Sequence, residues 1–358
     1  MLNPFGLSTP ELEALAAQLG QPEFRGRQLA RWLFKRNETD PAAMSDLPKG
    51  FREALQGRHG GRPHSGVGAL DVLGQRVAAD DTRKFLFGAA GGWTLEAVLM
   101  PYRESGTPRV TACISTQVGC AVGCVFCATG LSGFQKNVSA GEMVEQVVRM
   151  QRETDLRVSN VVFMGMGEPF LNYDETLKAA RILNKEVGIG MRHLTISTSG
   201  VIPGIDRLAD ERLQLTLAVS LHAPNDELRD YLVPINKRYP LADLKRAMVG
   251  FFEKTGRRIT VEYVLLAGVN DSEALARQLA VYLADMPGTH VNLIPYNATD
   301  AEFQPSTPAV AVRFRAILRE RGVNATLRVE RGAEIEGACG QLRRRLEGGA
   351  PLAKEAGG

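Results

Sequence analysis

The fold of this chain is limited most strongly by a regular alternation of strand-like and helix-like segments that begins near residue 109. Apolar runs such as residues 160–166 and 257–266 alternate with amphipathic segments that start at capping residues, such as residues 139–153 and 307–322. This alternation predicts a parallel sheet with right-handed helical crossovers. The roughly six or seven units are too few for a complete eight-stranded barrel, so we predict an α/β fold with a partial (βα)6 TIM-like open barrel.

The segments before and after the barrel have a different pattern. Residues 1–75 are predicted to form a small N-terminal helical accessory domain that ends in a Gly-rich linker. Residues 76–108 are predicted to form a β-hairpin extension that turns at Gly91 and Gly92. The barrel core is expected over residues 109–345 and a flexible tail over residues 346–358.

The 358-residue chain contains five cysteines, and four of them lie between residues 113 and 127. An odd number of cysteines, with no basic and apolar export signal at the N-terminus, argues against a disulfide framework. No apolar run approaches the roughly 18–20 residues that span a bilayer. We therefore expect a soluble cytoplasmic protein with no membrane partner, in which the clustered cysteines serve metal or redox chemistry.

Three of these cysteines, Cys120, Cys124 and Cys127, have the spacing Cys-x3-Cys-x2-Cys. Three thiolates so close together can bind three irons of a 4Fe–4S cluster. The fourth iron is then open to the amino and carboxylate groups of S-adenosylmethionine (SAM). A structural zinc site needs a fourth ligand, and no cysteine or histidine follows within the next few dozen residues. The motif therefore predicts a radical SAM enzyme.

A second motif, MGMGEP at residues 164–169, follows the next predicted strand. Gly165 and Gly167 permit close approach to the backbone, so the strand-end carbonyls and amides, together with Glu168, are candidates for binding SAM. The alternative is a tight turn in which Glu168 caps the following helix.

Later strand ends carry further polar groups that would meet at the same edge of a parallel sheet. Each of these residues, taken singly, is also typical of a turn. As a set, they predict contacts to SAM. They are Ser199, the run Ser220, Leu221 and His222, and Asn297.

The other two cysteines and the basic clusters have less specific patterns. Cys113 lies within the first barrel strand, and Cys339 follows the last strand in the small-residue loop GAEIEGACGQL. A lone cysteine is most often an apolar core residue. Basic residues cluster at 25–36 and at 343–345, although the formal net charge is only +3. Such clusters either bind phosphates or are solvated surface.

Several motifs together resemble the bacterial dual-specificity RNA methyltransferases of the radical SAM superfamily. The resemblance extends from about residue 5 to residue 345. It implies methylation of carbon 2 of adenosine in 23S ribosomal RNA, at the peptidyl-transferase centre, and in transfer RNA next to the anticodon. The matching motifs are GCAVGCVFCATG, FMGMGEP, TISTSGV, SLHAPND, NLIPYN and EIEGACGQLRRR.

The resemblance also implies roles for individual residues. Cys339 corresponds to a cysteine that accepts a methyl group from one SAM molecule, and a second SAM molecule serves the radical step. Cys113 corresponds to the cysteine that releases the product by forming a disulfide with Cys339. Glu96 corresponds to a proton acceptor, although its place in the predicted hairpin alone would suggest an exposed strand residue.

The expected partners follow from the same resemblance. The N-terminal helices would bind RNA, and a flavodoxin or ferredoxin would supply electrons to a protein expected to be a monomer. Two alternatives remain open at this point. One is methylation of carbon 8 of the same adenosine, which gives antibiotic resistance, and the other is a non-catalytic RNA-binding protein with a structural metal.

Overall fold

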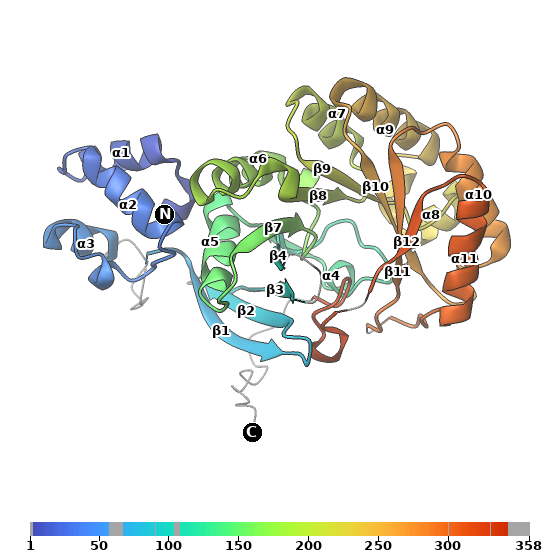
Figure 1. Ribbon diagram of the computed structural model, residues 1–358, viewed down its shortest axis with the longest axis horizontal. Helices are drawn as coiled ribbons and strands as arrows, with labels where there is room; N and C mark the ends of the chain where they lie inside the picture. The colour runs from blue at the N-terminus through green and yellow to red at the C-terminus, as the bar shows by residue number, and fades with distance from the viewer. Residues whose placement is uncertain are drawn as a thin grey trace.

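The computed structural model describes residues 3–56, 67–89, 91–103, 108–299, 301–329 and 331–342. Most of the predicted linker, the basic run at residues 343–345 and the tail at 346–358 therefore lie outside the described residues. Figure 1 shows the N-terminal helices grouped at one end of the molecule and a curved sheet with helices along its outer face in the rest of it.

In the described part of the chain, ten strands form one sheet in the order β1-β2-β3-β4-β7-β8-β9-β10-β11-β12. The strands from β4 onward are parallel, and β1, β2 and β3 extend the sheet in antiparallel fashion beyond β4. The two ends of this order, β1 and β12, are not paired with each other, so the barrel is open. The predicted α/β fold with a partial, TIM-like barrel is confirmed.

The strand bounds are β1 Leu70–Val77, β2 Arg83–Ala89, β3 Thr94–Tyr102, β4 Arg109–Cys113, β7 Val158–Phe163, β8 Leu194–Thr198, β9 Thr216–Ser220, β10 Ile259–Leu265, β11 Thr289–Pro295 and β12 Ala325–Leu327. A separate antiparallel pair joins β5 (Gln117–Gly119) to β6 (Phe134–Asn137). This pair encloses the segment that carries the three closely spaced cysteines.

The helices begin and end at the expected signals. Ser139 and Glu142 form a capping box at the start of α5, Thr307 caps α11 with Pro308 in its first turn, and Gly256 ends α9 in the left-handed region. The helix bounds are α1 Thr9–Gln18, α2 Phe24–Phe34, α3 Lys49–Gln56, α4 Ala128–Leu131, α5 Ala140–Gln151, α6 Tyr173–Ile182, α7 Ile202–Asp210, α8 Asp226–Leu232, α9 Leu241–Thr255, α10 Glu273–Leu283 and α11 Pro308–Glu320. No helix among the described residues is both long enough and apolar enough to cross a bilayer.

The antiparallel extension contains the expected hairpin of β2 and β3, and also a strand that the sequence did not predict. Residues 70–75, which were expected to belong to the helical domain and its linker, form most of β1. This strand pairs with β2, has an irregular register between Val72 and Gly74, and lies at the edge of the sheet. An edge strand with a break in its register has only a weak alternation of apolar and polar residues, which explains why the sequence pattern missed it.

Glu145 on α5 connects the N-terminal segment to the barrel. The side chain is completely buried, and burial raises the pKa of its carboxyl group. The carboxylate accepts hydrogen bonds from Asn3 Nδ2 at 3.0 Å, from the Ala69 and Leu70 amides at 2.7 and 3.1 Å, and from Arg149 Nε at 2.8 Å. One side chain therefore fixes both the start of the chain and the entry into β1.

We predict that Glu145→Gln destabilises the protein by about 1–3 kcal/mol, because an amide leaves buried donors without the charged acceptor that they share. The measurement is urea unfolding at pH 7. The same change at the exposed Glu253 on α9 serves as the control and should be nearly neutral. Equal stability of the two variants would contradict this role for Glu145.

Candidate functional site

A cavity at the carboxyl ends of the parallel strands brings together most of the residues predicted from the sequence. They lie on loops that are far apart along the chain, yet all of them line the same cavity. Leu221 and Glu96 do not line it, and both side chains are completely buried. The predicted residues that line the cavity are Cys113, Cys120, Cys124, Cys127, Gly167, Glu168, Ser199, Ser220, His222, Asn297 and Cys339.

The three closely spaced cysteines lie on the loop between β5 and α4. The loop is closed at its base, where the Cys120 amide donates to the Gly133 carbonyl at 3.0 Å. Gly119 has a φ of +75°, and a Cβ atom there would lie 1.7 Å from the Gly133 oxygen. Only glycine therefore allows the backbone to turn at this point, and the turn directs the three thiols into the cavity.

The donor set fits a 4Fe–4S cluster better than a single metal ion. No group of three cysteine, histidine or acidic side chains in the described residues is arranged to hold one ion. A cube-shaped cluster takes each thiolate on a different iron, so its ligands need not meet at one point. Burial raises the pKa of Cys120 to about 12, and bound iron would compensate the charge of such buried thiolates.

The wall beside the cluster loop is apolar. Phe126 contacts the edge of the His222 ring, with 4.9 Å between ring centroids. Burial lowers the pKa of His222 to about 3, so the ring is neutral at physiological pH. Its Nδ1 atom accepts a hydrogen bond from the Val264 amide at 3.1 Å, which leaves the proton on Nε2. His222 is therefore a neutral hydrogen-bond donor on this wall of the cavity.

Glu168, which follows β7, has the capping role that was one of its two expected roles. One carboxylate oxygen accepts from the Phe170 amide at 3.0 Å, as a helix cap does, and the other accepts from the Ser199 amide and hydroxyl at 2.7 Å each. Burial raises the pKa of Glu168. The Met166 and Glu168 amides already donate to Ser115 Oγ and Gln117 Oε1, so these two amides are not available to SAM.

Arg229 on α8 is a structural residue of the site that the sequence did not suggest, because arginine is rarely buried. The side chain is completely buried. It donates to the carbonyls of Ser199 at 2.6 Å, Leu221 at 3.0 Å and Ser220 at 3.2 Å, and to Asn236 Oδ1 at 2.8 Å. Burial lowers its pKa to about 10, so it remains charged at neutral pH. Arg229 therefore fixes the ends of β8 and β9.

Two further charged residues inside the barrel were also missed. Glu262 on β10 and Arg328, just after β12, both line the cavity. Burial raises the pKa of Glu262, whose carboxylate accepts from Asn292 Nδ2 at 2.8 Å. The pKa of Arg328 is raised first by Cys339 and also by Glu262. A glutamate within the apolar run ITVEYVL was the available signal for Glu262.

The segment that carries Cys339 is attached to the cluster loop and to the end of β11. The Ala128 amide donates to the Gly340 carbonyl at 2.9 Å, and Gln341 Nε2 donates to the Ala298 carbonyl at 3.0 Å. Asn297 Nδ2 donates to the Cys339 carbonyl at 3.4 Å, whereas its buried Oδ1 has no hydrogen-bond partner in the described structure. That oxygen is available to a ligand in the cavity.

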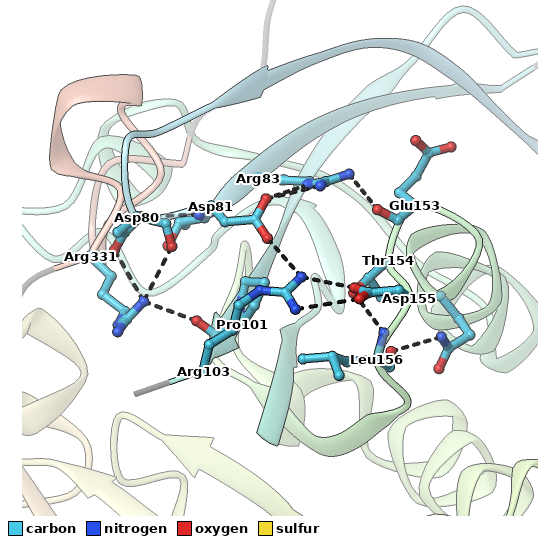
Figure 2. A network of polar contacts seen from close by, with 12 residues as sticks. Asp80, Asp81, Arg83, Pro101, Arg103, Glu153, Thr154, Asp155, Leu156 and Arg331 are labelled. Carbon is cyan, nitrogen blue, oxygen red and sulfur yellow. Dashed lines mark hydrogen bonds and ion pairs between the residues drawn. The ribbon is translucent and has the colours of Figure 1, made fainter. Parts of the chain in front are cut away.

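The other side of the same segment is attached to the antiparallel extension, as Figure 2 shows. Arg331 donates to the Pro101 carbonyl at 3.0 Å and lies 3.3 Å from the Asp80 carboxylate. The neighbouring Asp81 binds Arg103, which also binds Asp155 at 2.8 Å. The segment thus crosses from the antiparallel strands to the cluster loop and places Cys339 in the cavity between them.

Comparisons with known proteins agree with this arrangement. A model of the radical SAM superfamily matches residues 114–279, and a model of the ribosomal RNA large subunit methyltransferase N-terminal domain matches residues 2–59. A Moorella thermoacetica protein named "Probable dual-specificity RNA methyltransferase RlmN" is 48% identical over 347 residues, which are 94% of this chain and 96% of the relative. This chain belongs to the RlmN family.

A second member of the RlmN family and a solved structure are similar to this chain over nearly its whole length. A Synechocystis protein of the same name is 46% identical, and the match covers 94% of this chain and 93% of that protein. The crystal structure of a radical SAM methyltransferase from Sphaerobacter thermophilus is 47% identical, with a TM-score of 0.88 over 95% of this chain and 98% of that one. Membership of the radical SAM superfamily implies a 4Fe–4S cluster and SAM.

The two outlying cysteines of this RlmN family member face the same cavity as free thiols. Burial is the main cause that raises the pKa of Cys113 to about 12, and the proximity of Cys339 raises it further. The sequence places these residues more than two hundred positions apart, so this proximity comes only from the fold.

Glu96 occupies a different position from the one that its sequence context suggested. Its side chain is completely buried on β3 and lies 3.3 Å from Lys84 Nζ on β2. The expectation of an exposed strand residue is therefore wrong. Glu96 shares its face of β3 with Val98 and Met100, which line the cavity, because alternate residues of a strand point the same way.

We predict that Cys124→Ala leaves the protein folded but with much less than four irons per chain after anaerobic reconstitution, because one iron of the cube loses its thiolate. Iron and sulfide analysis, with the visible absorbance of the sample, provides the measurement. A full complement of iron in this variant would contradict the cluster assignment.

Proposed function

We propose that this protein is an RNA methyltransferase that methylates carbon 2 of adenosine, in 23S ribosomal RNA at the peptidyl-transferase centre and in transfer RNA next to the anticodon. The proposal rests on one observation above all, which is that Cys339 and Cys113 face the cavity that the three cluster thiols also face. The relatives are named as probable dual-specificity RNA methyltransferases, which supports RNA as the substrate class.

Residues that could hold the cofactors are already in place. Cys120, Cys124 and Cys127 would bind the cluster. When bound, the cluster and SAM supply the one-electron chemistry that an electron-poor aromatic carbon requires, since carbon 2 of adenine is a weak nucleophile. For SAM, we propose a binding site formed by Gly167 and Glu168, by Ser199, by the segment Ser220, Leu221 and His222, and by Asn297. We also propose that each turnover uses two SAM molecules.

Leu221 and Glu168 would contribute to the SAM site indirectly, through the neighbouring groups that they hold in place. The Leu221 side chain is buried away from the cavity, and its carbonyl and amide are bonded to Arg229 and to the Glu262 carbonyl. Glu168 is fully engaged with Ser199 and Phe170. The two residues therefore position the strand ends, while the buried Asn297 Oδ1 offers a direct contact.

Cys339 would accept the methyl group from the first SAM molecule by nucleophilic displacement. Only a thiolate is an effective nucleophile in such a step, and the positive charge of Arg328 lies near this sulfur. The methyl carbon, after losing a hydrogen, would bond to carbon 2 while it remains attached to the Cys339 sulfur. The cysteine therefore holds the carbon at the reaction centre throughout the step, which is catalysis by positioning.

The last steps use Glu96 and Cys113. Glu96 would accept the proton that leaves carbon 2. The adduct formed by radical addition would also lose one electron, for which the bound cluster could serve as the acceptor. The Cys113 thiolate would attack the Cys339 sulfur, so that an S–S bond forms, the S–C bond breaks and its electron pair returns to the carbon, which takes up a proton to become the methyl group. A disulfide brings two Cα atoms within about 7 Å, which requires Cys339 to move with its loop or to lie close already.

RNA would bind partly through the N-terminal domain. Arg27, Arg31, Lys35 and Arg36 on and after α2 are exposed, and such side chains contact phosphates. We further propose that the protein acts in the cytoplasm as a monomer, and that a flavodoxin or ferredoxin supplies its electrons.

The position of methylation is tested by nucleoside mass spectrometry of ribosomal and transfer RNA from a strain that lacks this gene. We expect 2-methyladenosine to disappear from both RNAs and to return when the gene is restored. Loss of 8-methyladenosine, or no change in either nucleoside, would overturn the proposed specificity.

The two outlying cysteines should give opposite results when each is changed to alanine. Cys339→Ala should bind cluster and SAM but form no covalent bond to RNA. Cys113→Ala should accumulate a protein–RNA adduct through Cys339, because the S–C bond cannot be broken. A denaturing gel with labelled RNA measures the adduct.

The double variant Cys113→Ala/Cys339→Ala is the matched control and should show no shifted band. If both single variants were equally inactive and neither was crosslinked, the two-cysteine mechanism would be rejected, whereas the cluster assignment would remain.

A further inference from the structure

Lys84 on β2 is a buried cation that has no part in the reaction proposed above. Its side chain has no exposed surface, and its Nζ atom lies 3.3 Å from Glu96 Oε1. Leu86 is the residue of β2 directly opposite Glu96, so Lys84 lies diagonally across the strand pair on the same face. The only carboxylate with a proposed proton-accepting role therefore has a lysine as its immediate neighbour.

The same ammonium group contacts the segment that carries Cys339. Lys84 Nζ donates to the Glu336 carbonyl at 3.2 Å and lies 3.6 Å from the Glu336 carboxylate, which is also 3.5 Å from Arg76 on β1. Glu336 has a φ of +55°, in the left-handed region, and lies three residues before Cys339. Lys84 thus connects Glu96 with the backbone turn that leads into Cys339.

Packing alone does not explain a lysine at this position. Burying an ammonium group costs several kcal/mol unless charges and acceptors compensate it, and an apolar side chain of similar volume is often as stable or more stable. Here two cations, Arg76 and Lys84, balance two carboxylates, Glu96 and Glu336. Glu336 reaches Arg76 and Lys84 because the Cys339 segment lies against β1 and β2.

We infer that Lys84 is a positioning residue, which orients the Glu96 carboxylate toward carbon 2 of the bound adenine and holds it in register with the Cys339 turn. This inference rests on the proposed function. Lys84 would therefore affect the step in which Glu96 removes the proton from carbon 2. Lys84 would not affect the earlier transfer of a methyl group to Cys339, because Glu96 has no role in that step.

The experiment compares two reactions in the reconstituted full-length protein with isotopically labelled SAM. Intact-protein mass spectrometry measures methylation of Cys339, and RNA methylation is measured in a single turnover. For Lys84→Met, we expect Cys339 methylation within about twofold of wild type and a loss of at least tenfold in RNA methylation. Lys84→Arg keeps the charge and should recover most of the lost rate.

Two further variants test whether Lys84 acts through Glu96. If it does, Glu96→Gln should resemble Lys84→Met, and the double variant should lose no more than either single variant. Arg103→Met is the control, because it removes a cation from the same extension without contacting Glu96. It should leave both reactions within about twofold of wild type. If Lys84→Met does not fold, Lys84→Gln provides the uncharged variant.

Three results would overturn the inference. They are equal losses of Cys339 methylation and RNA methylation in Lys84→Met, additive losses in the double variant, and RNA methylation at the wild-type rate without Lys84. Each leaves the proposed function standing. A wild-type protein that never acquires a methyl group on Cys339 would instead reject the proposed function, and the role of Lys84 would fall with it.

Discussion

A buried guanidinium group holds together the strand ends that form the cavity. Arg229 donates to three backbone carbonyls at the ends of β8 and β9, and Glu168 connects β7 with β8 through Ser199. Removing one partner of such a buried charged network typically costs about 3–5 kcal/mol. This network fixes the ends of β7, β8 and β9, whose residues line the same cavity as the cysteine thiols.

The cavity is completed from the opposite direction by the end of the described chain. Residues 331–342 contact the antiparallel extension through Arg331 and Glu336, and the cluster loop through Gly340. The antiparallel strands are therefore more than an addition to a radical SAM barrel. They contact the segment that carries Cys339, and β3 itself carries Glu96. The proposed methyl carrier and the proposed proton acceptor are therefore held by the same antiparallel strands.

The sequence predicted those parts of the site that depend on local spacing. The triad of Cys120, Cys124 and Cys127 needs only a short loop, and the barrel strands each carry an apolar run between helix signals. Polar residues at strand ends could be expected to meet, because parallel strands align their carboxyl ends. Their presence around one cavity agrees with that reasoning.

The remaining parts could not be predicted because they depend on long-range packing. Glu96 and Lys84 resemble ordinary polar residues of a hairpin, and their burial and their contact with the segment near Glu336 depend on the tertiary fold. Arg229 lies in a polar helical segment whose sequence does not indicate burial. The proximity of Cys113 and Cys339 was implied by family resemblance, since no spacing rule relates residues so distant in the chain.

The openness of the barrel has a mechanical consequence. β12 lies at one edge of the ten-stranded sheet and β1 at the other, and the segment after β12 returns to contact β1, β2 and β3. This segment thus connects two edges of the sheet that, in the described part of the chain, no ladder of hydrogen bonds joins. A bulky substrate that moved the two edges of the sheet apart would also pull on the segment after β12. The distance between the edges and the position of the Cys339 sulfur would therefore change together.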